Sequence, residues 1–311
     1  MFHTILVPLD GSELAERALP YAEVMARANG CRILLLRVVP ASHVIVGDPM
    51  ADQAKAVREA ESYLADVAAR LKTPQIIESA VFIGDPADSI VEEIDLRNVD
   101  LVVMSTHGRS GLGRWVYGSV ADQVMRRAMV PVLLIPASCH AEWWSHRPSR
   151  VLVPLDGSDL ATTALPVASN LVSWLGGELF LLRVIVPTSP VYADGIPQAE
   201  IDREAERDVA RRYLEEIGAR LRDRGQNVKL VDARGPAPAM IAATAAEQNV
   251  DLIAMSTHGR GGITRLLMGS VATGVVQQAS VPVLIIPPGS TPGPHDEPVL
   301  TTKPDQATAR R

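Results

Sequence analysis

The sequence has little of what marks a secreted, membrane-spanning or nucleic-acid-binding protein. Only two of its 311 residues are cysteine, Cys31 and Cys139, which excludes a disulfide scaffold and favours the reducing cytoplasm. The first residues carry no basic segment of the kind that opens a signal peptide, and no apolar run approaches the ~18 residues that suggest a membrane helix. The formal net charge of -6 gives no broad positive field, which argues against nucleic acid and anionic membranes as general partners.

The better-known nucleotide-binding and metal-binding motifs are also missing. There is no G-x-x-x-x-G-K-[ST] segment, and the glycines from Gly108 to Gly113 reverse the order of G-x-G-x-x-G. A P-loop NTPase and a dinucleotide dehydrogenase are therefore poor fits. A nucleotidyl-activating ligase is disfavoured as well, because no S-G-G-x-D-S loop follows the first strand. The spacing of Cys139, His140 and His146 matches no zinc pattern, so these residues are interpreted as part of a linker.

What the sequence does have is an internal repeat. Residues 5–22 and 151–168 are identical at 13 of 18 positions. Residues 100–120 and 251–271 are identical at 13 of 21 positions. A repeat of this length predicts two copies of one folding unit.

We expect a first domain at 1–137, a linker at 138–148, a second domain at 149–288 and a disordered tail at 289–311. Within each half, short apolar runs alternate with longer amphipathic stretches, which predicts a mostly parallel sheet with helices on both faces. In the first half the expected strands are 5–9, 33–39, 76–83, 101–104 and 132–135, and the expected helices are 13–28, 51–71, 86–98 and 119–127. Pro20 should kink the first of these helices.

The first recurring motif follows the first strand of each half. It reads Pro8-Leu9-Asp10-Gly11-Ser12, and it returns at 154–158. An aspartate at this position can accept hydrogen bonds from a ribose or a purine, or help to hold a metal. The alternative is a carboxylate that only complements the dipole of the following helix, for which Ser12 is a plausible N-cap.

The second recurring motif is a glycine-rich loop after the fourth strand, at 105–119 and again at 256–270. Each loop ends in Gly-Ser, where a helix is expected to begin. Glycines let the backbone approach a ligand closely, and the free N–H groups at a helix start bind phosphate. Ser119 can add a hydroxyl, and Arg109 or Arg114 a positive charge. The alternative is a flexible surface loop with a serine N-cap.

The spacing [small]-x2-G-x9-G-[ST], after a V-P-L-D-G-S strand, resembles the ATP-binding subgroup of the universal stress protein family. The resemblance covers both halves. It implies two Rossmann-like α/β domains in tandem, each a five-stranded parallel sheet with strand order 3-2-1-4-5 and helices on both faces. This order places strands one and four side by side at the topological switch point, where ligands bind in open α/β sheets.

The resemblance also implies a cofactor, ATP with Mg or Mn, bound once in each half. In the first half the implied contacts are Pro8, Asp10 and Val39 with the adenosine part, Met104 and Ser105 near the adenine and ribose, and Gly108, Arg109, Gly111, Gly118, Ser119 and Val120 with the phosphates. Their counterparts are Pro154, Asp156, Ile185, Met255, Ser256, Gly259, Arg260, Gly262, Gly269, Ser270 and Val271. The family motif usually begins with glycine, whereas both copies here begin with serine, at 105 and 256.

The leading hypothesis is therefore an ATP-binding regulatory protein of stress physiology. The alternative is a nucleotide-free interaction or chaperone-like module of the same fold, against which the two retained glycine loops argue. We expect slow hydrolysis or none, because the loops have no P-loop lysine and no Gln or Glu spaced to aim a water molecule. His107 and His258 are the remaining candidates for a general base, although neither has a Ser or Cys nucleophile at a fixed spacing.

Each half ends in an apolar strand, Val-Pro-Val followed by three further apolar residues, at 130–135 and 281–286. An edge strand this apolar is a liability unless it is paired or covered. We therefore predict that the two fifth strands pair, which would pack the halves about a pseudo-twofold axis as an intramolecular pseudo-dimer. Two whole chains could also associate as a homodimer.

Overall fold

The fold is that of a computed structural model that describes residues 2–41, 49–73, 75–106, 118–139, 149–187, 198–257 and 268–290. The first half contains β1 (Thr4–Pro8), α1 (Glu13–Glu16), α2 (Leu19–Asn29), β2 (Arg32–Val39), α3 (Pro49–Arg70), β3 (Ile77–Ile83), α4 (Pro86–Leu96), β4 (Leu101–Ser105), α5 (Ser119–Arg127) and β5 (Val132–Ile135). The second half contains β6 (Arg150–Pro154), α6 (Asp159–Thr162), α7 (Ala164–Leu175), β7 (Glu178–Ile185), α8 (Gln198–Arg222), β8 (Val228–Arg234), α9 (Ala237–Glu247), β9 (Leu252–Ser256), α10 (Ser270–Gln278) and β10 (Val283–Ile286).

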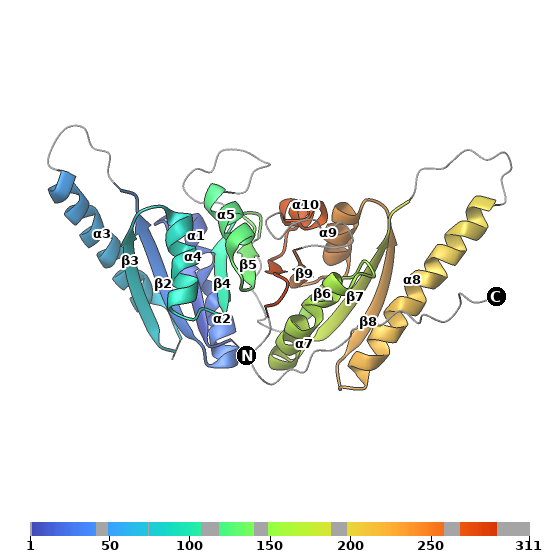
Figure 1. Cartoon of the computed structure of the whole chain (residues 1–311). Coiled ribbons are helices and arrows are strands. Elements are labelled where there is room, and N and C mark those ends of the chain that lie inside the picture. The colour runs from blue at the N-terminus through green and yellow to red at the C-terminus, as the bar shows by residue number, and fades with distance from the viewer. Residues whose placement is uncertain are drawn as a thin grey trace, which may run out of the picture.

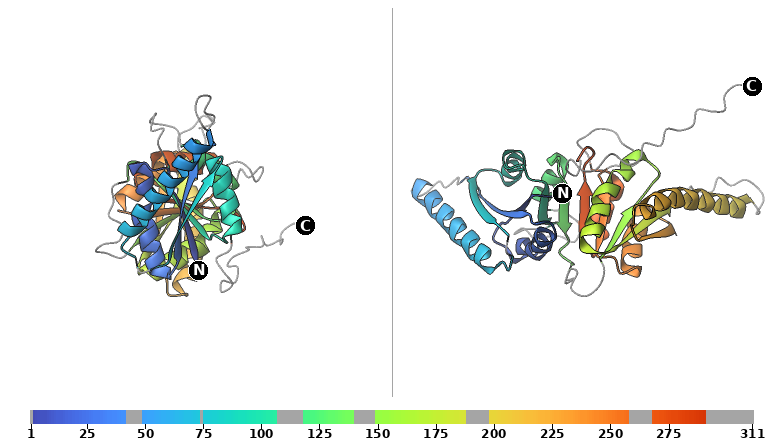
Figure 2. Two further views of the ribbon diagram at one scale, coloured as in Figure 1. Left: turned by 90° about the vertical axis from the view of Figure 1, so that its left-hand side faces the viewer. Right: turned by 90° about the horizontal axis from the view of Figure 1, so that it is seen from below.

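The ten strands form one continuous sheet that runs through the whole molecule (Figure 1). Its order is β3-β2-β1-β4-β5-β10-β9-β6-β7-β8. Within each half the strands are parallel and follow the predicted order 3-2-1-4-5, so the predicted fold class is confirmed. The view along the sheet in Figure 2 shows helices around a strongly twisted sheet.

Alternation along the strands builds a core on each face of the sheet. In β1, Ile5 and Val7 belong to one buried cluster, while Leu6 belongs to the other. The first cluster lies under α2 and α3 and under their counterparts α7 and α8. The second lies under α4 and α5 and under α9 and α10. Because both faces are covered, the strands are apolar throughout, as parallel strands usually are.

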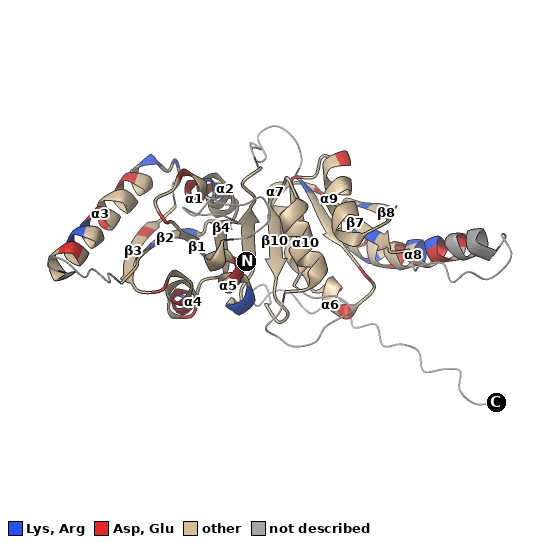
Figure 3. Cartoon of the chain, turned by 90° about the horizontal axis from the view of Figure 1, so that it is seen from above, with Lys and Arg blue, Asp and Glu red and all other residues tan. Residues whose placement is uncertain are grey.

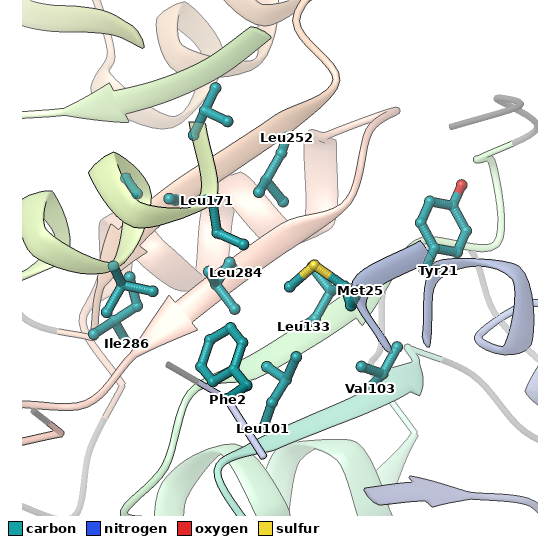
Figure 4. Close-up of a cluster of buried hydrophobic side chains, with 14 of the residues drawn as sticks. Phe2, Tyr21, Met25, Leu101, Val103, Leu133, Leu171, Leu252, Leu284 and Ile286 are labelled. Carbon is teal, nitrogen blue, oxygen red and sulfur yellow. The ribbon is translucent and has the colours of Figure 1, made fainter. Parts of the chain in front are cut away.

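The two halves are joined by antiparallel pairing of β5 with β10, as predicted. Leu133 pairs with its repeat counterpart Leu284, and the flanking pairs are Val132 with Ile285 and Leu134 with Val283. This register is symmetric, since exchanging the two halves returns the same pairs. Leu133 and Leu284 are fully buried and lie in one cluster with Phe2 (Figure 4). Because β5 and β10 run in opposite directions, the carboxyl ends of the first-half strands and those of the second-half strands point in opposite directions.

The first predicted helix is divided into α1 and α2 instead of being only kinked. The break follows Glu16, four residues before Pro20. The proline ring excludes the carbonyl of the residue four positions earlier and supplies no N–H for it, so Glu16 is the last residue that α1 can keep. Pro166 has the same effect in the second half, where α6 ends at Thr162.

Several predicted features lie outside the described residues: most of both glycine-rich loops, at 107–117 and 258–267, the linker at 140–148 and the tail beyond 290. Cys139, predicted as linker, is buried against the first half, where its Sγ lies 2.9 Å from the Tyr21 hydroxyl. Among the described residues, no helix is long and apolar enough to cross a membrane.

Candidate functional site

The register of the sheet gathers the predicted site residues at the carboxyl ends of neighbouring strands. β1 and β4 pair directly, through Ile5 with Leu101 and Leu6 with Val102. β2 lies on the other side of β1. The last residues of these three strands are Pro8, Ser105 and Val39. In the second half the corresponding strand ends are Pro154, Ser256 and Ile185. Each half thus brings these strand ends together at its switch point, the place where ligands bind in open α/β sheets.

The aspartate after the first strand shapes the turn that enters α1. Asp10 Oδ1 accepts hydrogen bonds from Ser12 N at 2.9 Å and from Ser12 Oγ at 2.6 Å. Ser12 Oγ accepts in turn from Ala15 N at 3.1 Å, which confirms Ser12 as the N-cap. Gly11 between them has φ +84°, a conformation that favours glycine. The carboxylate therefore has a structural role in the turn, as the alternative interpretation expects.

The second half repeats this geometry closely. Asp156 Oδ1 accepts from Ser158 N at 2.9 Å and from Ser158 Oγ at 2.5 Å, and Gly157 has φ +85°. The two aspartates therefore occupy equivalent positions after the first strand of each half.

The glycine-rich loop begins and ends at one point of the sheet. Gly118 N donates to Thr106 O at 2.8 Å, and Gly269 N donates to Thr257 O at the same distance. Gly118 and Gly269 are the N-caps of α5 and α10, and neither helix has a side-chain cap.

The backbone corrects one detail of the loop interpretation. Ser119 and Ser270 are the first helical residues and not the N-caps, because the glycine before each takes the cap position. Gly118 has φ -54° and Gly269 has φ -60°, so neither glycine is required by a positive φ.

The alternation of β2 places the residue before each predicted strand end on the same face of the sheet as the predicted methionine. Val38 packs on the cluster that contains Met104, whereas Val39 is absent from that cluster. The same holds for Val184 and Met255 in the second half. Period-2 alternation is the signal that could have found them, because a side chain on the face of Met104 must be one residue before or after Val39.

Of the remaining predicted contacts, Met104, Met255 and Ser256 are buried. Ser105 and Val120 are half-buried, and Ser119 and Ser270 are exposed in the first helical turns. Val271 is 38% exposed. Six predicted phosphate contacts and the two histidines lie outside the described residues: Gly108, Arg109, Gly111, Gly259, Arg260, Gly262, His107 and His258.

A charged residue in each second strand was also missed. The Arg37 guanidinium lies over the Tyr63 ring of α3, with Cζ 4.6 Å from the ring centre. In the second half Arg183 lies over Tyr213 at 5.7 Å, and its Nη1 donates to Leu155 O at 3.2 Å. The signal was present as an arginine that interrupts both apolar strands at the same repeat position.

Other chemistry-bearing groups lie away from this edge. A cavity of about 490 Å³ is lined by His3, Arg32, Asp100 and other residues at the amino ends of the strands. Cys31 is buried just before β2, and burial raises the pKa of its thiol to about 12, so it is no activated nucleophile. Within the described segments, no group of three or more His, Cys, Asp or Glu could hold a metal ion.

Comparison with known proteins decides the family. The model of the universal stress protein family matches the chain twice, over residues 1–136 and 148–287. The chain belongs to the universal stress protein family. A tandem universal stress protein of Mycobacterium tuberculosis is 27% identical over 296 residues, which cover 91% of this chain and 96% of that protein. A universal stress protein of Thermus aquaticus is 33% identical and matches 43% of this chain over 99% of its own length.

Solved structures agree with this assignment. A universal stress protein from Archaeoglobus fulgidus superposes with a TM-score of 0.70 at 26% identity, covering 92% of this chain and 98% of its own. A putative universal stress protein from Pseudomonas aeruginosa has a TM-score of 0.63 at 18% identity, covering 92% and 93%, and supports the fold alone. The chain is thus a tandem universal stress protein, with one copy of the family fold in each half.

Proposed function

We propose that each half of this universal stress protein binds one adenine nucleotide, ATP with Mg or Mn, in the crevice between its first and fourth strands. The observation that carries the proposal is the pairing, twice in one chain, of an aspartate turn with a helix start. Asp10 follows β1, and Gly118 opens α5 beside the end of β4. Asp156 and Gly269 stand in the same relation in the second half.

The residues at this edge fit the chemistry of a nucleotide. α5 and α10 begin at a glycine with no side-chain cap, so their first N–H groups are suited to phosphate oxygens. By contrast, α1 and α4 are capped by Ser12 and Asp85. Met104 and Val38 supply an apolar surface for the base. The bound metal would supply positive charge between the phosphates.

We further propose that the protein holds ATP as a regulatory ligand and hydrolyses it slowly or not at all. Among the described residues of the two crevices, Asp10 and Asp156 are the repeated carboxylates, and each holds a turn through Oδ1. The buried, free thiols of Cys31 and Cys139 accord with a reducing cytoplasm. Phosphate release by the pure protein with magnesium or manganese tests this. Turnover near the ~1–100 s⁻¹ of kinases, abolished in His107→Ala with His258→Ala, would make the protein an enzyme.

Native mass spectrometry of the purified full chain is the direct test of binding. The expected result is two bound adenine nucleotides per chain, falling to one in Asp10→Ala or in Asp156→Ala and to none in the double variant. A chain that carries no nucleotide after incubation with ATP and magnesium would favour a nucleotide-free interaction module of the same fold.

A further inference from the structure

The two halves hold the aspartate turn from behind through different contacts. In the first half, the Arg37 guanidinium lies over the Tyr63 ring and beside Gly11. A Cβ atom at Gly11 would lie 2.7 Å from Arg37 Nη1, so a larger residue there would displace the guanidinium. Arg37 thus ties the turn that contains Asp10 to α3, the long helix that carries Tyr63.

The first half adds a carboxylate to this contact. Tyr63 donates its hydroxyl hydrogen to Glu16 Oε1 at 2.9 Å, and Arg70 Nη2 donates to Glu16 Oε2 at 2.9 Å. Glu16 is the last residue of α1, the helix that Ser12 caps and the Asp10 turn opens. Burial, followed by the hydrogen bond to Glu16, raises the pKa of Tyr63, so its hydroxyl remains a donor at neutral pH.

The second half holds its turn through a different contact. Arg183 Nη1 donates to the carbonyl oxygen of Leu155, the residue before Asp156, at 3.2 Å. Thr162 stands where the first half has Glu16, and its Oγ1 donates to Asp159 O at 2.6 Å. Arg220, the counterpart of Arg70, pairs with Glu216 on its own helix. No carboxylate at the end of α6 therefore links that helix to α8.

We propose that Glu16, Tyr63 and Arg70 are positioning residues that hold the Asp10 turn in its binding geometry and so raise the affinity of the first half for adenine nucleotide. The inference rests on the proposed function. A group that is already fixed loses less freedom on binding, and this raises affinity without any new contact to the ligand. Because α1 spans only four residues, a shift of Glu16 is passed to Ser12 and from there to Asp10.

Titration calorimetry of the full chain with ATP and magnesium tests the proposal, with Asp156→Ala isolating the first site and Asp10→Ala the second. Tyr63→Phe removes the hydroxyl and keeps the ring over Arg37. In the first site it should lower affinity roughly fivefold, the scale of one lost positioning contact. Tyr213→Phe is the matched control in the second site, where no glutamate faces the tyrosine from position 162, and should leave affinity unchanged.

The reverse graft separates positioning from stability. Thr162→Glu should raise the affinity of the second site, because the new carboxylate can reach Tyr213 as Glu16 reaches Tyr63. Thermal unfolding of each variant shows whether it is folded. Unchanged first-site affinity in a folded Tyr63→Phe variant would overturn the inference while leaving the proposed function intact. No heat of binding at either site in the unmodified chain would remove the proposed function, and this inference with it.

Discussion

The amino ends and the carboxyl ends of the strands compare differently between the two halves. At the amino edge, Arg32 of β2 pairs with Glu78 of β3 at 3.4 Å. At the same place in the second half, Glu178 of β7 pairs with Lys229 of β8 at 2.8 Å, so the two charges have changed places. At the carboxyl edge, the aspartate, glycine and serine of the turn are the same residues in both halves, with nearly the same distances.

The difference separates two kinds of constraint within one chain. A cross-strand ion pair needs only opposite charges, so the partners can be exchanged without loss. The turn keeps the same residue at each position, as the proposed nucleotide site would require. The outer strand of the second half also carries ion pairs of opposite order. Arg207 of α8 pairs with Asp232 of β8, whereas Glu206 of α8 pairs with Arg234 of β8. Figure 3 shows the charges of both signs that crowd α8.

At the joint between the halves, β5 and β10 contribute equivalent residues to one symmetric strand pair. Substitutions there should lower the free energy of unfolding more than any other substitution proposed here. Leu133→Ala removes a fully buried side chain and should lower the free energy of unfolding by about 2–5 kcal/mol. Leu284→Ala should cost a similar amount, because the register is symmetric about this pair. Urea denaturation measures both. Leu96→Ala is the matched control, since Leu96 is 70% exposed. Clearly unequal costs at the two leucines would contradict the symmetric joint.

Replacing Asp10 or Asp156 tests the carboxyl ends of the strands, where the two halves have the same turn residues. Asp10→Ala and Asp156→Ala should each weaken ATP binding in their own half about tenfold to hundredfold, the loss of ~1.5–3 kcal/mol from a charged acceptor. Titration calorimetry measures each site with the other disabled. Asp95→Ala, an exposed aspartate of α4, serves as the control and should bind normally. Equal binding by Asp10→Ala and the unmodified chain would show that the turn is conserved for folding alone.

Gly118 allows binding to be separated from folding, because its backbone conformation is one that residues other than glycine also adopt. At φ -54° an alanine is tolerated, so Gly118→Ala should leave the unfolding midpoint nearly unchanged and lower ATP affinity severalfold through the added methyl group. Gly30→Ala is the reciprocal control. Its φ of +69° predicts a loss of stability of about 1 kcal/mol, with no change in affinity. A Gly118→Ala variant that binds ATP normally but unfolds early would assign this glycine to the fold.

Much of the fold could be predicted because strong local signals agreed with the tertiary structure. The bounds of α5 and β5 match the prediction, since Gly-Ser opens the helix and an apolar run marks a buried strand. The break after Glu16 was underestimated, because a kink and a complete interruption have the same sequence signal. The pairing of β5 with β10 followed from two apolar edges.

Less of the candidate site could be predicted from the sequence. Arg37 interrupts an apolar strand, and strand periodicity gives no reason for it. Its reason is tertiary: Tyr63 lies 26 positions later and meets it only when α3 packs on β2. Val38 was not among the predicted contacts, because a resemblance fixes a strand end to within about one residue, whereas a single step moves a side chain to the other face.

The smallest change in stability is expected at the amino ends of the strands, where the two halves carry the same ion pair with its charges exchanged. Glu78→Lys should lower the free energy of unfolding by roughly 0.5–1 kcal/mol, since it replaces two half-exposed ion pairs, with Arg32 and Arg97, by like charges. Adding Arg32→Glu recreates the order of the second half and should recover part of that loss. The recovery is incomplete because Arg32 also donates to Thr4 Oγ1 and to Arg97 O, bonds that a glutamate cannot make. Urea denaturation in low salt measures the coupling between the two positions. If Arg32→Glu added its own full cost to that of Glu78→Lys, the edge would depend on the identity of each residue, and the contrast with the carboxyl edge would fail.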